Sequence, residues 1–574
     1  MKAMDAEGNP DKLGRSSLFK RLAAGMLVAG CLFAPVRTQG QQIGPRSTAI
    51  RPTAKFYGIA GTLTNSITGE AMAGATLTLH TEMPGETLQT AVTDADGRFQ
   101  LNPVPAGKYA LSASRRGYTT AYFDEHEEYS SAIVTGEGQD TEHIPFRLNP
   151  GAMIRGVVTD DAGEAVERAR ISLVRRTKNG GLGEHLVQSI SGVTDDTGLF
   201  EFWNLVPGTY FLAVNAEPWF ALHPSLAEQN QIASNEQRQS VAALDVAYPV
   251  TYYGGVTDEA AATPISIASG ERVEANVALH AVPAIHLTMR ATERNGGQQG
   301  IYGGLMLRQR ILGNQESANS FPPRPGPPGS ETVEFVGVAP GRYSVWQGNP
   351  ARVTEIETTG SQEVDLSAGA PTFSVAINVR MADGTPPPEA LSLTLQSDDS
   401  RLRPITARSL AKPDVQFDSV PPGRWNVMAQ GNGLWLSVIS IQSGQGSAAD
   451  SRITVTDRRL SVTAVLAQGK TGLEGLATKN GKGEAGVMVV LVPRNPAANL
   501  AQFRRDQSDS DGSFLLRGVV PGRYTVVAIE NGWDLDWARP EVIARYLQGG
   551  TPVTVAETAG ASMRLTAPVV VQER

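Results

Sequence analysis

The feature that most constrains this fold is a fifteen-residue pattern that the chain repeats five times. Each copy has alternating apolar residues, then a turn that ends in Gly, then an aromatic residue two positions later. Alternation with a period of two predicts strands that bury one face, and the Gly-containing turn between them predicts a β-hairpin. The copies are "FQLNPVPAGKYALSA" (99–113), "FEFWNLVPGTYFLAV" (200–214), "VEFVGVAPGRYSVWQ" (333–347), "VQFDSVPPGRWNVMA" (415–429) and "FLLRGVVPGRYTVVA" (514–528).

The copies align without gaps, and their glycines are 101, 133, 82 and 99 residues apart, the size of a small β-sandwich. The aligned residues are Gly107, Gly208, Gly341, Gly423 and Gly522, each with its aromatic partner Tyr109, Tyr210, Tyr343, Trp425 or Tyr524. An aromatic residue so placed predicts a buried ring at a sandwich corner, with its hydroxyl bonded to backbone; in Trp425 the indole N–H would donate instead.

The repeat therefore predicts an all-β tandem array of about five β-sandwich modules. Module 2 carries a polar insertion at 223–247 that suits a short helix or a loop, and modules 3 and 4 are divergent. The predicted segments are a signal peptide (1–42), a linker (43–54), module 1 (55–149), module 2 (150–282), module 3 (283–369), module 4 (370–467) and module 5 (468–574).

A second turn precedes the hairpin in modules 1, 2 and 5. It reads "TDADGRF" (93–99), "TDDTGLF" (194–200) and "SDSDGSF" (508–514). The paired aspartates raise the question of calcium, but an EF-hand loop needs an acid at position one and Glu at twelve, which these loops lack. Asp-x-x-Gly predicts instead a hairpin turn in which the Asp side chain accepts from nearby backbone.

Modules 1, 2 and 5 also share an opening, "IAGTLTNSITGEAMAGATLTL", "IRGVVTDDAGEAVERARISL" and "LEGLATKNGKGEAGVMVVL". Together with the two turns, this opening resembles the carboxypeptidase regulatory-like family. The resemblance implies a transthyretin-like sandwich of seven strands, here without a peptidase domain. It also implies carbohydrate binding, because the wider superfamily is related in fold to starch-binding domains.

The N-terminus is typical of an export signal. A basic "FKRL" precedes an apolar run, Leu22 to Pro35, whose fourteen residues are too few to span a membrane. "VAGC" within it resembles a lipoprotein lipobox, which implies lipidation of Cys31 and an N-terminal lipid anchor. The alternative is a chance cysteine, with cleavage near "RTQG|QQ". Either way we expect an exported protein of the periplasm, the outer-membrane surface or the extracellular space, without a transmembrane span.

The sequence offers little catalytic chemistry. None of the seven histidines belongs to an H-x-x-E or H-x-x-H pair, which speaks against a zinc peptidase. "SLAK" (409–412) and "KTG" (470–472) match serine-enzyme motifs, but they lie in predicted hairpin and boundary segments. We therefore predict no enzyme, no cofactor and no metal. The net charge of −8 also argues against nucleic acid as a partner.

Aromatic residues in connections are the better lead to a binding site, because sugar rings stack on exposed aromatic faces. Trp219 follows the second hairpin, and Trp533 and Trp537 follow the fifth, with Asp534 and Asp536 beside them as acceptors for sugar hydroxyls. The alternative is that these aromatics pack one module against the next. The acidic run "FDEHEEY" (123–129) is most simply a solvated loop; a cation site or a proton-sensitive contact is the alternative.

These observations predict a non-catalytic, exported cell-envelope protein that binds glycan. The alternative is a protein-interaction scaffold, for example an accessory subunit of an envelope transport or secretion complex, with exposed edge strands as its contact surface.

Overall fold

The computed structural model describes residues 55–81, 86–177, 185–290, 305–312, 315–316, 323–326, 332–348, 351–399, 402, 404–408, 414–431, 433–443, 446–448, 450–456 and 459–574. The predictions for the export signal, for Cys31 and for the linker lie outside these residues. No helix in the described part of the chain is long and apolar enough to cross a membrane.

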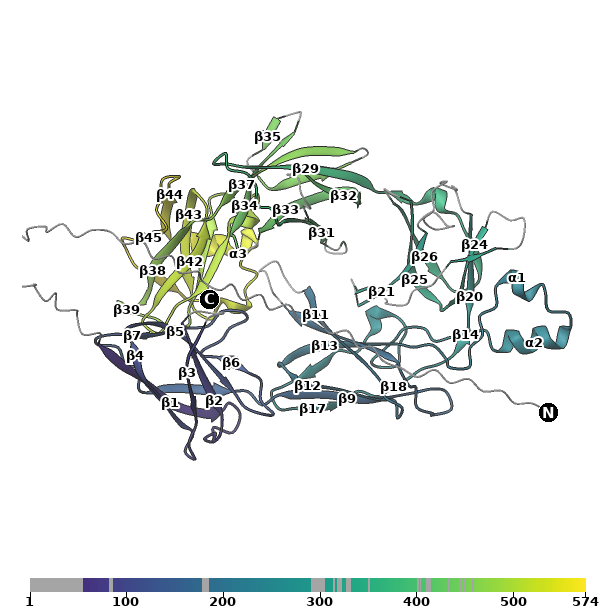
Figure 1. Cartoon of the computed structure of the whole chain (residues 1–574), viewed down its shortest axis with the longest axis horizontal. Coiled ribbons are helices and arrows are strands. Elements are labelled where there is room, and N and C mark those ends of the chain that lie inside the picture. The colour runs from purple at the N-terminus through teal and green to yellow at the C-terminus, as the bar shows by residue number, and fades with distance from the viewer. Residues whose placement is uncertain are drawn as a thin grey trace, which may run out of the picture. The chain divides into compact units, whose positions relative to one another are not determined.

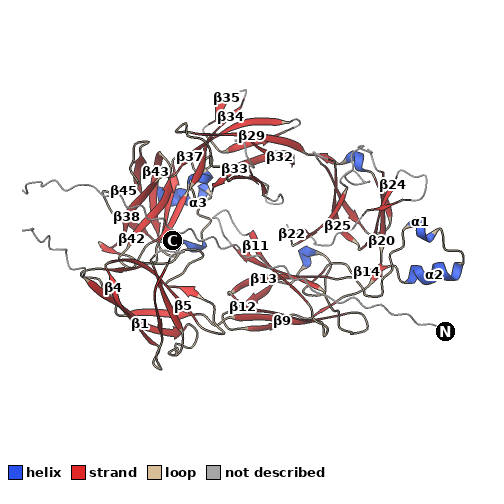
Figure 2. Ribbon diagram, in the orientation of Figure 1, coloured by secondary structure: helices blue, strands red, loops and turns tan. Residues whose placement is uncertain are grey.

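The described residues form strands far more often than helices (Figure 2). Their buried apolar side chains gather in five main clusters, each within one module: Ile59–Leu148, Ala152–Leu279, Ile285–Leu366, Val375–Leu466 and Leu473–Val569. The predicted class, an all-β tandem array of β-sandwich modules, is confirmed (Figure 1). The module boundaries stay predictions.

Module 1 places two sheets around its core, with orders β4-β1-β8 and β3-β2-β5-β6; β7 also pairs with β5. Its strands are β1 (Phe56–Asn65), β2 (Thr76–His80), β3 (Thr87–Val92), β4 (Arg98–Pro105), β5 (Gly107–Ser114), β6 (Ala121–Tyr122), β7 (Ile133–Thr135) and β8 (Ile144–Leu148).

Module 2 repeats this plan with β12-β9-β17 and β11-β10-β13-β15. Its elements are β9 (Ala152–Thr159), β10 (Arg170–Thr177), β11 (His185–Val193), β12 (Leu199–Leu205), β13 (Gly208–Asn215), α1 (Leu226–Gln229), α2 (Asn235–Ala243), β14 (Val246–Ala247), β15 (Thr251–Tyr252), η1 (Glu259–Ala261), β16 (Ile265–Ile267), β17 (Arg272–Glu274) and β18 (Val277–Ala278). Helices α1 and α2 lie in the insertion, where a short helix was one of the two predictions.

Modules 3 and 4 are also pairs of sheets: β23-β24-β20-β27 and β22-β21-β25-β26-β28, then β32-β29-β37-β34-β35 and β31-β30-β33-β36. A short strand, β19 (Val282–Pro283), pairs with β14 before module 3 begins. The elements of module 3 are β20 (Ile285–Arg290), β21 (Met306–Ile311), β22 (Gln315–Glu316), β23 (Arg324–Pro325), β24 (Thr332–Val338), β25 (Gly341–Gln347), β26 (Arg352–Thr358), β27 (Gln362–Val364) and η2 (Leu366–Ala368). Those that follow are β28 (Ala370–Pro371), β29 (Phe373–Met381), β30 (Leu391–Ser397), β31 (Ile405–Arg408), β32 (Asp414–Val420), β33 (Gly423–Gly431), β34 (Leu436–Ser443), β35 (Gly446–Ala448), β36 (Arg452–Val455) and β37 (Leu460–Gln468).

The strands of module 5 form one continuous sheet in the order β39-β38-β46-β43-β40-β41. In addition, β42 and β45 pair with β38, and β44 pairs with β43. Its elements are β38 (Thr471–Lys479), β39 (Lys482–Gly483), β40 (Met488–Pro493), η3 (Leu500–Gln502), β41 (Arg504–Gln507), β42 (Ser513–Val519), β43 (Gly522–Ile529), η4 (Gly532–Asp534), α3 (Pro540–Leu547), β44 (Thr551–Val555), β45 (Ser562–Arg564) and β46 (Val569–Gln572).

One hydrogen bond recurs at the repeated hairpin in all five modules. The aromatic residue after the Gly is buried, and its polar hydrogen bonds the carbonyl oxygen four residues earlier, at 2.7–3.1 Å: Tyr109 to Pro105, Tyr210 to Val206, Tyr343 to Ala339, Trp425 to Pro421 and Tyr524 to Val520. The indole N–H of Trp425 does replace the hydroxyl. In module 5 the ring lies close to the glycine, since a Cβ at Gly522 would lie 3.0 Å from the Tyr524 ring.

Candidate functional site

The residues predicted to bind ligand lead to a junction between modules 1 and 5. In module 1 the chain after β5 carries the acidic run 123–129 and then β7. In module 5 the facing residues come from the edge strand β41 and from the turn that follows it, 508–514. These two segments are almost 400 residues apart in the sequence, and their hydrogen bonds join the first and last modules of the described chain.

Backbone pairing fixes how the two segments meet. The N–H of Ser510 donates to the carbonyl of Ala132 (3.0 Å), and the N–H of Ala132 donates to Asp509 Oδ1 (2.9 Å). The N–H of Val134 donates to Ser510 Oγ (2.9 Å), and the buried hydroxyl of Ser131 donates to the carbonyl of Ser508 (2.9 Å). The turn of module 5 thus continues the hydrogen bonding of module 1 along β7.

A lysine of the first hairpin completes this contact. Lys108 Nζ lies 2.5 Å from Asp509 Oδ2 and 2.8 Å from Ser513 Oγ. Burial raises the pKa of Asp509, an effect that the Lys108 charge opposes. Because the lysine side chain is about half exposed, we expect this ion pair to contribute little to stability.

Arg505 on β41 is the charged centre of the junction. Its side chain is 3% exposed, and it pairs with Glu127 of module 1 at 2.5 Å. Its guanidinium carbon lies 4.7 Å from the ring centre of Tyr129, 4.8 Å from Trp537 and 5.6 Å from Trp533. The Nε and Nη1 atoms have no hydrogen-bond partner, so the aromatic faces supply the electrostatic contact that a desolvated cation needs.

Module 1 contacts Trp533, one of the three tryptophans that were predicted to stack on sugar. Trp533 is 9% exposed; His126 lies parallel to it, with ring centres 5.0 Å apart and planes 8° apart. Its other neighbours include Ile543 and Tyr546 of module 5. Trp537 is partly buried against the same cluster, with its ring 5.7 Å from that of Phe503. These placements match the packing alternative for the two residues.

The remaining predicted residues are more accessible. Asp534 lies 3.3 Å from Arg574, and Asp536 lies 3.5 Å from Arg539, so both carboxylates face cations of module 5. Trp219 is 87% exposed and is not brought to this junction by any contact described for it. Within the acidic run 123–129, Glu127 pairs with Arg505, and its side chain is 20% exposed.

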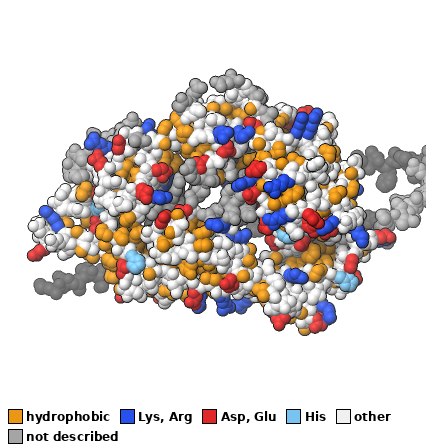
Figure 3. Space-filling view, turned by 180° about the vertical axis from the view of Figure 1, so that it is seen from behind, with side chains coloured by type: hydrophobic (Ala, Val, Ile, Leu, Met, Phe, Trp, Pro, Cys, Tyr) orange, Lys and Arg blue, Asp and Glu red, His pale blue; other side chains and the backbone are white. Residues whose placement is uncertain are grey.

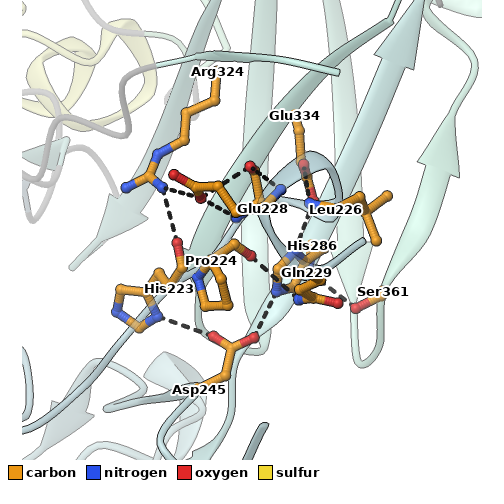
Figure 4. A network of polar contacts seen from close by, with 11 residues as sticks. His223, Pro224, Leu226, Glu228, Gln229, Asp245, His286, Arg324, Glu334 and Ser361 are labelled. Carbon is orange, nitrogen blue, oxygen red and sulfur yellow. Dashed lines mark hydrogen bonds and ion pairs between the residues drawn. The ribbon is translucent and has the colours of Figure 1, made fainter. Parts of the chain in front are cut away.

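A second charged junction, which sequence reasoning missed, joins the insertion of module 2 to module 3 (Figure 4). His286 on β20 lies between two carboxylates, with ring nitrogens 2.7 Å from Asp245 Oδ2 and 2.7 Å from Glu334 Oε1. The hydrogen bonds of the ring nitrogens to Asp245 and then to Glu334 raise the pKa of His286 to about 9, which favours the cationic ring at neutral pH. His223 Nδ1 lies 3.1 Å from the other oxygen of Asp245.

The first helix of the insertion fixes Glu334 from the other side. The N–H of Leu226, at the start of α1, donates to Glu334 Oε2 (2.9 Å). Ser225 and Glu228 form a capping box at that helix start, which explains why the helix begins there. Alternation in "VEFVGV" predicts an outward-facing Glu334, yet its side chain is 1% exposed because the insertion covers it. The alternation within one strand could not predict that the insertion of module 2 buries Glu334.

No curated protein matches the chain. Among solved structures, the chain is similar to the Bacillus anthracis TIE protein (9% identity, TM-score 0.17, covering 91% of this chain and 75% of that one). It is also similar to the minor pilin GBS52 of Streptococcus agalactiae (13% identity, TM-score 0.20, covering 40% of this chain and 97% of that one). A third similar structure is the major pilin subunit BcpA of Bacillus cereus (10% identity, TM-score 0.13, covering 72% of this chain and 99% of that one). TM-scores this low establish no shared arrangement.

A family model gives the more specific result. The model of the carboxypeptidase regulatory-like domain matches residues 58–148, a range that holds the first opening, both turns and the strands β2 to β8. Residues 58–148 of module 1 are therefore similar to the carboxypeptidase regulatory-like domain.

Proposed function

We propose that this protein is an exported, non-catalytic scaffold of the cell envelope whose modules are held to one another by specialised connections. The observation that carries the proposal is the buried junction of Arg505 with Glu127 and the surrounding aromatic rings. A buried charge that is paired across two modules disfavours their separation, because separation leaves it without its partner. A scaffold needs such fixed geometry.

The position of these connections supports the same role. In modules 1, 2 and 5 they follow the equivalent strands β5, β13 and β43, directly after the repeated hairpin. The fifteen-residue repeat ends within that strand. All three connections contribute to a junction between modules: 123–134 in module 1, 223–247 in module 2, and 530–550 with Trp533 and Trp537 in module 5.

The chemistry of the charged clusters supports a role without catalysis. Asp245, His286 and Glu334 form an acid–histidine–acid row. Ser361 Oγ, a hydroxyl bonded to His286, accepts its backbone N–H and not a ring nitrogen. A serine nucleophile would need its base at hydrogen-bond distance. The described residues include no group of three or more His, Cys, Asp or Glu that could hold a metal. On the face shown in Figure 3, acidic and basic side chains are interspersed.

Fractionation of cells that express the full chain tests export. We expect the mature protein in the envelope or the medium, and retention in the cytoplasm would contradict the proposal. Proximity cross-linking in the same cells tests the scaffold role, with the Arg505→Ala variant as comparison. Envelope partners captured by wild type and lost in the variant would support it.

Glycan binding is a second candidate function, because Trp219 presents an open aromatic face. A cleft of about 560 Å³, lined by Tyr122, Arg147, Asn149 and Arg175 among others, also offers hydroxyl-bonding groups. Retention of the full chain on purified envelope polysaccharides tests this function. We expect Trp219→Ala to lose retention and Trp203→Ala, which removes another exposed tryptophan, to keep it. Equal retention of both variants would exclude Trp219 as the site.

A further inference from the structure

We infer that the junction of modules 1 and 5 also forms between two copies of this chain, module 1 of one copy binding module 5 of the other. Each half of the junction is built by one module alone. Module 1 supplies Lys108, Glu127 and the backbone of Ala132 and Val134; module 5 supplies the partners of all four. Neither half needs a residue of the other to complete its own sheet.

The complementarity of the two halves identifies the partner. Lys108 meets an aspartate and Glu127 meets an arginine, so the charges are exchanged across the contact. The backbone bonds between 132–134 and 509–510 fix one register. The two halves differ, so the contact is heterologous. In a single copy, module 1 binds module 5 of the same chain. In two copies that exchange modules, module 1 of each chain binds module 5 of the other. A second copy is the one partner that always presents both halves.

The chemistry of the contact permits this exchange. The peripheral pairs are polar, and Lys108 and Ser510 stay partly in water. Opening the contact leaves the buried Arg505 without Glu127, but the reciprocal exchange restores this pair in both junctions. When the two modules separate, Trp533 keeps its neighbours Ile543 and Tyr546, because both belong to module 5. Closure within one chain has the advantage of effective concentration, so the exchanged form accumulates where copies are crowded. The inference depends on the scaffold proposal only in one respect, namely that copies of the chain are crowded together in the cell envelope.

Disulfide trapping tests the exchange directly. The chain has one cysteine, Cys31, which is replaced by Ser in every variant. Val134→Cys and Ser510→Cys are then made in separate full-length chains, at two positions that hydrogen-bond across the junction. The two chains are mixed, incubated over a concentration series and oxidised. We expect a disulfide-linked heterodimer on non-reducing gels, with a yield that rises with concentration.

Two controls make the result decisive. Val92→Cys is a matched partner for Ser510→Cys, because Val92 is 65% exposed on module 1 but has no contact described with module 5. We expect the 134/510 pair to cross-link about tenfold more than the 92/510 pair; equal yields would overturn the exchange. The double variant in one chain must form its disulfide internally. An internal disulfide without the intermolecular one would overturn the exchange and leave the scaffold proposal intact.

A charge-exchange pair keeps the inference testable if the cysteines perturb folding. Lys108→Asp and Asp509→Lys each place like charges across the junction within one chain. In a mixture, the reciprocal contact restores opposite charges at both junctions. We expect native mass spectrometry to show the mixed dimer in excess over either homodimer, whereas the Lys108→Asp/Asp509→Lys double variant stays monomeric. A statistical distribution of dimers would contradict the inference.

Discussion

The same turn occurs in modules 1 and 5 and serves two different purposes. In both, the first hydroxyl fixes the turn to its own module. Thr93 Oγ1 donates to the Met72 carbonyl and accepts from the N–H of Ala75, and Ser508 Oγ makes the equivalent bonds within module 5, to the Glu484 carbonyl and from the N–H of Val487. This part of the pattern carries the fold.

The aspartate after this hydroxyl residue, Asp94 in module 1 and Asp509 in module 5, has a different role in each turn. Asp94 Oδ1 accepts from the backbone N–H of Asp96 (2.9 Å) and of Arg98 (2.8 Å), which confirms the predicted turn chemistry in module 1. In module 5, Asp511 accepts the equivalent local bond from Ser513, so Asp509 is released to bind module 1. Both turns carry two aspartates. In module 5 the second one, Asp511, accepts the local bond, and the first one, Asp509, is part of an interface.

The strand before the turn shows the same contrast. Counting back from the turn, Val92 of module 1 corresponds to Gln507 of module 5, and Thr90 corresponds to Arg505. Val92 is 65% exposed on an edge strand, whereas Gln507 is 1% exposed and donates to the Asp124 carbonyl. An exposed edge is a liability that proteins often cover. Here the edge of module 5 is covered by module 1.

Removal of the buried cation should have the largest effect on this contrast. Arg505→Ala leaves Glu127 unpaired and opens the space between Tyr129 and Trp537, so we expect the docking of the two modules to weaken by about 3–5 kcal/mol. Hydrogen exchange of residues 123–134 measures the effect. Arg98→Ala removes an exposed ion pair of module 1 and should change little. Unchanged protection in Arg505→Ala would show that the junction does not depend on this cation.

The next effect concerns Asp506, beside Arg505. Burial raises the pKa of this carboxyl to about 7, above its usual value of 3.8. Since the folded-state pKa is the higher one, stability is greatest below pH 3.8 and is lost as the pH rises through 7. Asp506→Asn should therefore stabilise module 5 at pH 8, on the order of 2 kcal/mol, and not at pH 4. Denaturant unfolding at the two pH values measures this, and an equal effect at both would contradict the burial argument.

A paired substitution in the two turns separates local stability from docking. We expect Asp94→Ala to cost module 1 about 1–2 kcal/mol, because two backbone N–H groups lose their acceptor. Asp509→Ala should cost a similar amount of docking energy and leave the turn of module 5 formed, since Asp511 keeps its local bond. Residue-resolved hydrogen exchange distinguishes the outcomes. Loss of the turn at 508–514 in Asp509→Ala would remove the distinction drawn here.

The smallest effect is expected at the half-exposed lysine. Lys108→Gln should weaken docking by about 0.5–1 kcal/mol, and added salt should reduce the difference from wild type. Thermal unfolding at low and high salt measures it. A salt-independent loss would point to packing of the lysine stem and not to its charge.

Much of the fold was predictable because it depends on local pattern. The alternation around Phe200 and Phe202 placed both rings in a core, and the hairpin glycines placed each aromatic against a carbonyl four residues earlier. The candidate site was less predictable. Trp533 and Trp537 were found as departures from the repeat, but the contact of Trp533 with His126 and Tyr129 comes from module 1, and nothing near it in the sequence indicates this contact.

The sequence by itself determined the strands, the turns and the corner bonds of each module, because these depend on residues within about fifteen positions of one another. Tertiary structure alone decided which polar residues are buried. Glu334 and Gln507 stand at positions where a single strand would face water, and each is covered by a connection from another module. Burial of a polar side chain depends on whether a distant segment supplies its hydrogen bonds, and periodicity within one strand carries no information about that segment.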